Sequence, residues 1–136
     1  MKQQLTILKV GGKIVETPAL LQQLLTDFAQ IEGRKILVHG GGRTATDMAT
    51  RLGIETHMVD GRRITDADML RVVTMVYGGL VNKTLIAQLQ SRGVNAIGLT
   101  GADMNVIRSH RRPLKNGIDY GFVGDVDKVD AERLAL

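Results

Sequence analysis

Short apolar runs alternate along the chain with segments whose apolar residues recur at helical spacing. The run 5–10 is short and apolar apart from Thr6 and Lys9, which predicts a strand, and the apolar run within 35–39 predicts a buried strand. Between them, Thr17-Pro18 is typical of a helix start and Gly33 of a helix end. The N-terminal part therefore predicts a strand, an amphipathic helix and a second strand.

The same alternation continues towards the middle of the chain. A helix is predicted over 43–52, a strand over 54–59 and a turn at Asp60-Gly61. Residues 65–68 have the form of a capping box, so a long helix should begin there and end at Gly93. This order continues the pattern of strands separated by helices.

The second half contains less regular features. Gly78-Gly79 lies in the middle of the long helix, which predicts a kink or a close backbone contact. Residues 94–100 predict another buried strand. The turn residues 113–117 separate two alternating segments, 104–110 and 120–126, and this arrangement predicts a β-hairpin.

Strands that alternate with helices predict an α/β fold. We expect a mainly parallel open sheet sandwiched between helices, with a β-hairpin near 104–126. The 136 residues suit one domain. Residues 130–136 begin like a capped helix, but the chain stops after about two turns. We therefore expect a protein cut short.

Composition and charge narrow the function classes. The net charge is +4, but aromatic residues are only 3%, which argues against a base-stacking surface, and the basic cluster 108–112 is interpreted as a solvated hairpin tip. The chain has no cysteine, which excludes disulfides and thiolate metal sites. No secretory signal is recognised, and no run approaches the roughly 18 apolar residues of a membrane span. A cytoplasmic protein without nucleic-acid or membrane partners is expected.

A glycine loop follows each of the first two predicted strands. Gly11-Gly12-Lys13 follows the first strand, and residues 40–42 with Arg43 follow the second. Glycine lets backbone N–H groups approach an anion closely, and a helix N-terminus adds positive potential. With Lys9, the loops predict a site for phosphate or carboxylate groups. A tight turn alone remains the alternative, and Ala45 in the third glycine position makes the dinucleotide-binding fingerprint a weak match.

The side-chain inventory favours a reaction that needs neither a general base nor a covalent nucleophile. The motifs G-x-S-x-G and H-E-x-x-H are missing, and His39, His57 and His110 are scattered. His39 is expected to be a packed, hydrogen-bonded side chain. A carboxylate is already ionised at neutral pH, so its phosphorylation requires alignment and charge neutralisation, which lysines and backbone N–H groups supply.

Six motifs in order along the chain resemble the amino acid kinase family and, within it, the N-acylglutamate branch. K-V-G-G alone is shared by several branches, whereas its combination with H-G-G-G and G-x-R-x-T is more specific. The resemblance spans the whole chain through residues 9–12, 38–42, 60–66, 79–83, 98–103 and 121–126.

The resemblance implies roles for individual residues. Lys9 would be the catalytic lysine that stabilises the transition state, and Gly11 and Gly12 would bind phosphate through their N–H groups. The residues that would hold the acylglutamate are Gly41, Gly42 and Arg63, with the Arg63 guanidinium on the α-carboxylate.

For a complete family member, the resemblance implies ATP-dependent phosphorylation of the γ-carboxylate of N-acetyl-L-glutamate. This is a phosphotransferase step of arginine biosynthesis, with ATP and Mg²⁺ as cofactors and a cytoplasmic homodimer or higher homo-oligomer as the assembly. Family members are much longer than this chain. Residues 1–136 are therefore expected to be the N-terminal acylglutamate-binding and dimerisation lobe, without the nucleotide-binding lobe, without a metal ligand and without appreciable activity alone.

Several alternatives stay open at this point. The acyl group could be succinyl, making N-succinylglutamate the substrate. The chain could also be a non-catalytic module that binds acyl-amino acids, or an assembly protein built on the long helix. Lys13 and Arg62 are equally well interpreted as surface charges, and residues 82–83 as support for the long helix.

Overall fold

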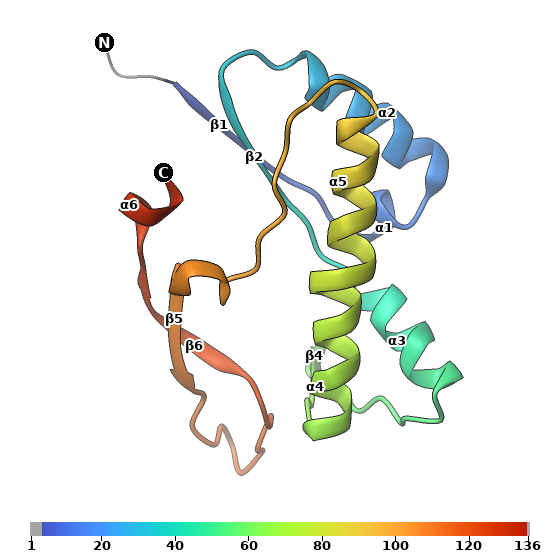
Figure 1. Ribbon diagram of the computed structural model, residues 1–136. Helices are drawn as coiled ribbons and strands as arrows, with labels where there is room; N and C mark the ends of the chain where they lie inside the picture. The colour runs from blue at the N-terminus through green and yellow to red at the C-terminus, as the bar shows by residue number, and fades with distance from the viewer. Residues whose placement is uncertain (1–3, 136) are drawn as a thin grey trace.

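The computed structural model describes residues 4–135 (Figure 1). Strands β1 (Leu5–Lys9) and β2 (Arg34–Val38) form a two-stranded parallel sheet in which Leu5 is opposite Arg34 and Lys9 is opposite Val38. Since the strands run in parallel, their carboxyl ends lie at the same edge of the sheet. Both predicted strands form, and the two segments that follow them begin side by side. The predicted burial of the second strand is wrong, because its residues are half-buried or exposed and Val38 is 44% exposed.

The crossover between β1 and β2 contains two helices. The four-residue α1 (Gly12–Val15) was not predicted, because it is too short to show a helical period. Helix α2 (Pro18–Gln30) begins as predicted, with Thr17 as N-cap residue and Pro18 in the first turn. It ends before Gly33, because Ile31 already has extended backbone angles.

After β2 the chain forms a third helix and a very small hairpin. Helix α3 (Gly42–Arg51) is confirmed. The strand predicted over 54–59 is wrong in extent, because only β3 (Met58–Val59) pairs, with β4 (Arg62–Arg63). Asp60 and Gly61 have φ of 49° and 72°, and these two positive values make the tight turn that the sequence predicted.

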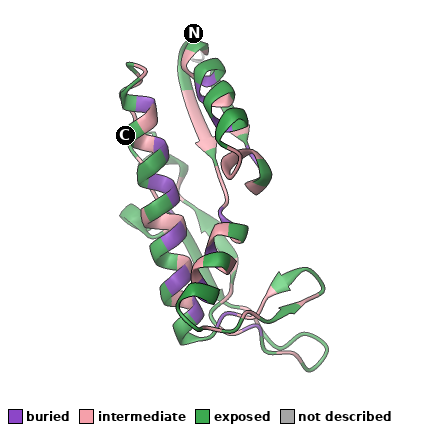
Figure 2. Ribbon diagram, turned by 90° about the vertical axis from the view of Figure 1, so that its right-hand side faces the viewer, coloured by how far each residue is buried: buried purple, intermediate pink, exposed green. Residues whose placement is uncertain are grey.

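One continuous helical run follows, made of α4 (Ala67–Val73), the π-helical segment η1 (Thr74–Val81) and α5 (Asn82–Gln90). Asp66 is the N-cap residue, and its carboxylate accepts a hydrogen bond from the Met69 N–H at 2.8 Å. This run of 24 residues is long and apolar enough to cross a membrane by those two criteria, contrary to the expectation above. Its buried face, however, packs in the core of this chain (Figure 2).

The core lies between the helices. The side chains of Leu25, Met69, Val72 and Val76 are less than 2% exposed, and the last three, all on the long helical run, recur three or four residues apart. Figure 2 shows buried stretches, in purple, along the length of the long helical run. The buried hydrophobic cluster consists of Leu21, Leu25, Phe28, Ala45, Ala49, Met69, Val72, Val76, Val81, Leu85 and Leu89.

The strand predicted over 94–100 is wrong, because this segment has no regular structure and Ile97 is 80% exposed. Side chains of the long helix, and not a neighbouring strand, donate hydrogen bonds to carbonyl groups of this segment. The Gln90 Nε2 donates to the Ala96 carbonyl at 3.0 Å, and the Lys83 Nζ donates to the Gly98 carbonyl at 2.9 Å. An apolar run becomes a strand only where another strand is available for pairing.

The C-terminal part is the predicted hairpin, formed by β5 (Ile107–Arg111) and β6 (Gly124–Val129) with a register shift between Arg108 and Ser109. A single turn, η2 (Asp103–Asn105), precedes it and the short helix α6 (Ala131–Leu134) follows it. Figure 1 shows the hairpin on the opposite side of the long helix from α3. The α/β class, the parallel strand pair and the hairpin are thus confirmed.

The hairpin is attached to the rest of the molecule through Gly121. Gly121 pairs with Thr65 in an isolated bridge, where the Thr65 N–H donates to the Tyr120 carbonyl at 2.9 Å and the Phe122 N–H donates to the Thr65 carbonyl at 2.7 Å. Tyr120 is 4% exposed, so the attachment also buries an aromatic ring. The turn before α4 and the hairpin therefore form one packed unit.

Candidate functional site

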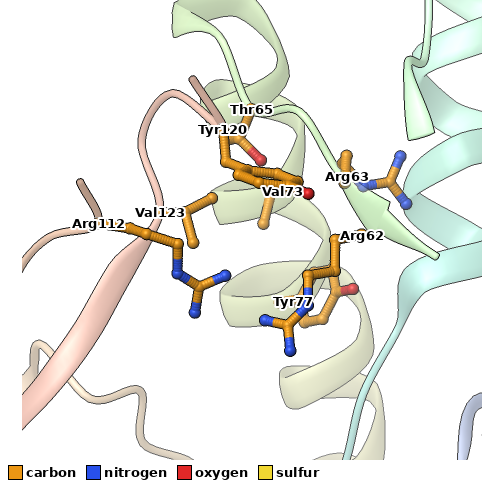
Figure 3. Close-up of a pocket in the computed structure, with 8 residues that line it drawn as sticks. All are labelled: Arg62, Arg63, Thr65, Val73, Tyr77, Arg112, Tyr120 and Val123. Carbon is orange, nitrogen blue, oxygen red and sulfur yellow. The ribbon is translucent and has the colours of Figure 1, made fainter. Parts of the chain in front are cut away.

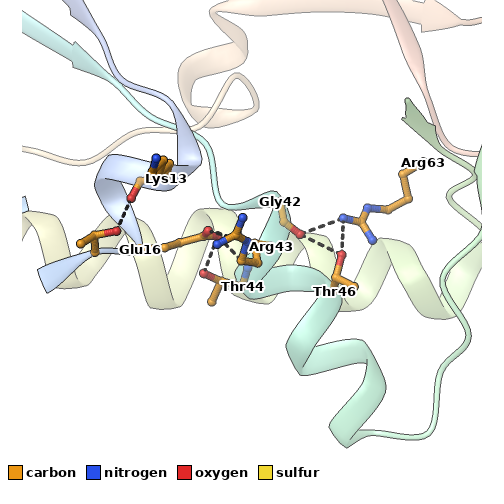
Figure 4. Close-up of polar contacts among 8 residues, drawn as sticks. Lys13, Glu16, Gly42, Arg43, Thr44, Thr46 and Arg63 are labelled. Atoms are coloured by element: carbon orange, nitrogen blue, oxygen red, sulfur yellow. Dashed lines mark hydrogen bonds and ion pairs between the residues drawn. The ribbon is translucent and has the colours of Figure 1, made fainter. Parts of the chain in front are cut away.

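The two glycine loops meet at one edge of the parallel sheet. The strand register ends with Lys9 opposite Val38, and the Val10 N–H donates to the Val38 carbonyl at 2.9 Å. Loop 1 (residues 10–13) and loop 2 (residues 39–42) leave the sheet directly after this contact. The structure therefore brings together the two loops that the sequence singled out, and Figure 4 shows Glu16, which follows α1, in contact with Thr44 in the first turn of α3.

Most backbone N–H groups of these loops are available to a ligand. Within residues 4–135, the N–H groups of Gly11, Gly12, Gly40, Gly41 and Gly42 donate no hydrogen bond. Such groups at the start of a helix are an established type of anion site. These N–H groups are therefore compatible with the predicted phosphate and carboxylate contacts.

Loop 2 lies directly on the long helix. A Cβ atom added to Gly41 would be 3.3 Å from the Val81 Cγ2, and one added to Gly42 would be 3.3 Å from the Tyr77 hydroxyl. These distances are shorter than most contacts of a Cβ atom. Packing against η1 is therefore a reason for glycine here, in addition to any need for bare N–H groups.

Glu16 already occupies the first turn of α3, and sequence reasoning missed it. Its Oε1 accepts hydrogen bonds from the Thr44 N–H at 2.8 Å and from the Thr44 hydroxyl at 3.0 Å, and the Arg43 Nε lies 3.6 Å from Oε2 (Figure 4). The Glu16 side chain is only 12% exposed. Since 28 residues separate Glu16 from Thr44, no local pattern could have revealed this contact.

Arg63 reaches loop 2 from the small hairpin. Its Nη2 donates to the Gly42 carbonyl at 2.9 Å and to the Thr46 hydroxyl at 3.0 Å (Figure 4). Its Nη1 makes only a long contact of 3.9 Å with the Met69 sulfur. The structure thus brings together all three residues predicted to bind substrate, Gly41, Gly42 and Arg63.

Lys9 is the exposed last residue of β1, at the point where loop 1 begins. Among the described residues, its side chain makes no ion pair. Gly11 and Gly12 follow it directly. The predicted catalytic and phosphate-binding residues therefore lie next to the predicted substrate-binding loop.

A hydrogen-bonded chain fixes the orientation of loop 2. The His39 Nδ1 is 2.9 Å from the Gly40 carbonyl, and the Asn82 Nδ2 is 3.1 Å from the His39 Nε2. A carbonyl accepts and an amide NH₂ donates, so the ring lies between an acceptor at Nδ1 and a donor at Nε2. His39 is thus the packed histidine that was expected, and Asn82, which is buried, connects it to the long helix.

A cavity of about 370 Å³ lies beside this site, between β4, the long helix and the hairpin (Figure 3). It is rich in arginine and tyrosine, and we call it the arginine cavity. Residues 4–135 contain no group of three or more His, Asp or Glu side chains able to hold a metal ion. The residues that line the cavity are Arg62, Arg63, Thr65, Val73, Tyr77, Arg112, Tyr120 and Val123.

Comparison with known proteins identifies the family. The model of the amino acid kinase family matches residues 4–135. The chain is 70% identical to an acetylglutamate kinase of Bacteroides thetaiotaomicron over 99% of its length, which is 52% of that protein. It is 42% identical to an acetylglutamate kinase of Methanopyrus kandleri, covering 94% of this chain and 50% of the relative. The chain thus spans about half the length of the curated relatives it matches.

Solved structures with the same fold include an N-acetylglutamate synthase of Neisseria gonorrhoeae, solved with coenzyme A and N-acetyl-glutamate. Its TM-score is 0.76 at 23% identity, and the match covers 96% of this chain and 30% of that chain. A second is the smu.665 protein of Streptococcus mutans, with a TM-score of 0.73 at 22% identity, covering 96% and 53%. At these identities the likeness concerns the fold alone.

Proposed function

Because this chain belongs to the amino acid kinase family, we propose that it supplies the acylglutamate-binding part of an acetylglutamate kinase. Such an enzyme transfers the terminal phosphoryl group of ATP to the γ-carboxylate of N-acetyl-L-glutamate, a step of arginine biosynthesis. The names of the relatives support the proposal. The observation that carries it is the meeting of two glycine loops at one sheet edge, with the Arg63 guanidinium on the second loop.

In this proposal, Arg63 binds the α-carboxylate of the substrate. Its Nη2 is engaged by Gly42 and Thr46, which holds the guanidinium beside loop 2 and leaves the Nε and Nη1 protons for a carboxylate. The N–H groups of Gly41 and Gly42 hold the rest of the acylglutamate. The γ-carboxylate then points towards loop 1.

Lys9, Gly11 and Gly12 act on the phosphoryl group. The γ-carboxylate is ionised at neutral pH, so the obstacle is the repulsion between two anions and not the removal of a proton. The ammonium of Lys9 and the two N–H groups lower that repulsion, and they do so most where charge accumulates in the transition state. No general base is needed, which fits a site whose histidine is engaged by Gly40 and Asn82.

The remaining elements of the proposal rest on the family alone. ATP is the phosphoryl donor, and Mg²⁺ neutralises its phosphates. Because the chain spans about half of its relatives, we place most nucleotide and metal contacts outside residues 1–136. We also propose a cytoplasmic homodimer or higher homo-oligomer, which sedimentation of the purified protein would test.

A chimera provides the test of function. This chain would replace the matched segment of the 70% identical Bacteroides thetaiotaomicron enzyme, and acyl phosphate would be trapped as the hydroxamate. We expect ATP-dependent turnover of N-acetyl-L-glutamate that Lys9→Ala strongly lowers. Lys115→Ala, in the exposed hairpin turn, is the matched control and should remain active.

The alternatives predict other outcomes. A chimera that folds and binds N-acetyl-L-glutamate without phosphorylating it would favour a non-catalytic binding module. A folded chimera that does neither would refute the proposal. The 136-residue chain alone should form no acyl phosphate, and turnover by it would refute our placement of the nucleotide contacts.

A further inference from the structure

Asn82 and Lys83, to which the proposed function assigns no role, lie between loop 2 and the segment that follows the long helix. After α5 the chain runs back along this helix (Figure 1), and the Lys83 Nζ donates to the Gly98 carbonyl at 2.9 Å. On the side of loop 2, the Asn82 Nδ2 lies 3.1 Å from the His39 Nε2. The two residues therefore connect loop 2 to residues 94–100.

Lys83 sets the orientation of the Asn82 amide. An ammonium group can only donate hydrogen bonds, and the Lys83 Nζ lies 3.0 Å from the Asn82 Oδ1. The amide oxygen is therefore turned towards Lys83, and the amide NH₂ is turned towards His39. Asn82 is only 6% exposed, so the protein supplies most of the hydrogen-bond partners of this amide.

The backbone of residue 98 fixes the position of the same side chain. A Cβ atom added to Gly98 would be 2.0 Å from the Asn82 Oδ1 and 2.8 Å from the Ile86 Cγ1. Both distances are shorter than real Cβ contacts, so a larger residue at 98 would displace the Asn82 amide. Gly98 therefore leaves the room that Asn82 occupies.

At the other end of this network, His39 sets the direction of one N–H group of loop 2. The His39 Nδ1 is 2.9 Å from the Gly40 carbonyl oxygen. A trans peptide unit is planar, so its carbonyl and its N–H point in opposite directions. With the Gly40 carbonyl turned towards His39, the Gly41 N–H points away from the ring, and within residues 4–135 it donates no hydrogen bond.

We propose, on the basis of the proposed function, that Asn82 and Lys83 are positioning residues for the substrate. Lys83 orients the Asn82 amide, and the amide orients the His39 ring. The ring then holds the Gly40-Gly41 peptide with its N–H directed at the acylglutamate. Neither Asn82 nor Lys83 touches the substrate, and both act on its binding because they set the direction of this N–H before the substrate arrives.

Lys83→Met is the informative variant, because Lys83 is exposed and methionine keeps a long side chain without a donor. In the chimera, we expect the KM for N-acetyl-L-glutamate to rise about threefold to tenfold. The kcat and the KM for ATP should change little, since the lost interaction serves substrate binding. Lys83→Arg keeps a donor and should restore most of the affinity. Asn82→Ala removes the whole link and should raise the same KM at least as much as Lys83→Met.

Gln90→Ala is the matched control. The Gln90 Nε2 donates to the Ala96 carbonyl at 3.0 Å. This variant therefore also removes a hydrogen bond between the long helix and residues 94–100, but it leaves Asn82 and His39 in contact. Its KM for N-acetyl-L-glutamate should equal that of the parent chimera.

An NMR measurement reports on loop 2 without any reaction. In the ¹⁵N-labelled 136-residue chain, Lys83→Met should shift the backbone amide signals of Gly40 and Gly41 and the ring nitrogen signals of His39. Gln90→Ala should leave these signals in place. The comparison tests the link from Lys83 to loop 2 separately from the kinase activity.

The outcomes separate this proposal from the proposed function. If Lys83→Met and Gln90→Ala change the KM and the loop 2 signals equally, or if neither changes them, the positioning role is wrong, and turnover by the parent chimera still supports the kinase function. A lower kcat at unchanged KM in Lys83→Met would also overturn the positioning role. If the parent chimera neither binds nor phosphorylates an acylglutamate while Lys83→Met shifts the loop 2 signals, the proposed function fails and the link to loop 2 stands.

Discussion

Gly121→Ala should detach the hairpin from the turn before α4. Gly121 has φ of 77°, and a Cβ atom there would be 2.1 Å from the Thr65 carbonyl oxygen and 2.8 Å from its carbon. Both obstructing atoms belong to the backbone, so no side-chain rotation relieves the overlap. The bridge between Thr65 and residues 120–122 has to open.

The expected loss of stability has two contributions, the strained backbone at residue 121 and the broken hydrogen bonds. Positive φ costs alanine about 1–2 kcal/mol relative to glycine. Opening the bridge breaks the hydrogen bonds from Thr65 to Tyr120 and from Phe122 to Thr65, worth about 1 kcal/mol each. The free energy of unfolding should therefore fall by about 3–4 kcal/mol.

Gly117→Ala is the matched control, since Gly117 also has φ of 75° but no atom lies within 4 Å of its added Cβ. It should lose only the backbone contribution of about 1–2 kcal/mol. Urea unfolding of both variants, followed by circular dichroism, measures the difference. Equal destabilisation by the two substitutions would refute the argument that Gly121 is required by contact with Thr65.

Further outcomes are expected at other residues. In the chimera, Lys9→Ala should lower kcat more than it raises KM, whereas Arg63→Ala should chiefly weaken binding, by about 2–4 kcal/mol; the same kinetic pattern from both would contradict their assigned roles. Glu16→Ala should lower the free energy of unfolding by about 1–2 kcal/mol, since Thr44 loses its partner at the start of α3; unchanged urea stability would disprove that contribution. Hydrogen bonds from Arg112 lower the pKa of Asp125. The stabilisation by this ion pair is therefore complete above the ordinary carboxyl pKa of about 4, and it is lost as the pH falls through the lowered pKa of Asp125. Asp125→Asn should therefore make the free energy of unfolding fall less steeply as the pH decreases below about 4. An unchanged dependence on pH would argue against this pair as a source of acid sensitivity.

The sequence predicted those parts of the fold that local interactions determine. Thr17-Pro18 begins α2 and Asp60-Gly61 forms a turn because backbone preferences act over a few residues. Residues 94–100 were mispredicted because strand formation depends on a distant partner. Within residues 4–135, side chains of the long helix bind that backbone instead.

In the candidate site, too, the sequence predicted the residues set by local pattern and missed those set by distant contacts. The glycine loops and Lys9 were recognisable, since each lies beside a predicted strand end. Glu16 and Arg112 were not recognised as parts of the site, because their positions depend on contacts with α3 and on the pairing of the hairpin. The alignment of the two loops followed from parallel pairing, and the strand register bears it out.

Because η1 is π-helical, the number of residues in this segment matters at this site as well as their types. Tyr77 lines the arginine cavity and also lies under Gly42, while Val81 lies under Gly41. A wider turn advances each residue by a smaller angle, and such turns are frequent at functional sites. Removing a single residue from 74–81 would therefore rotate the floor of both regions relative to α5, and no substitution elsewhere in the helix could restore their alignment.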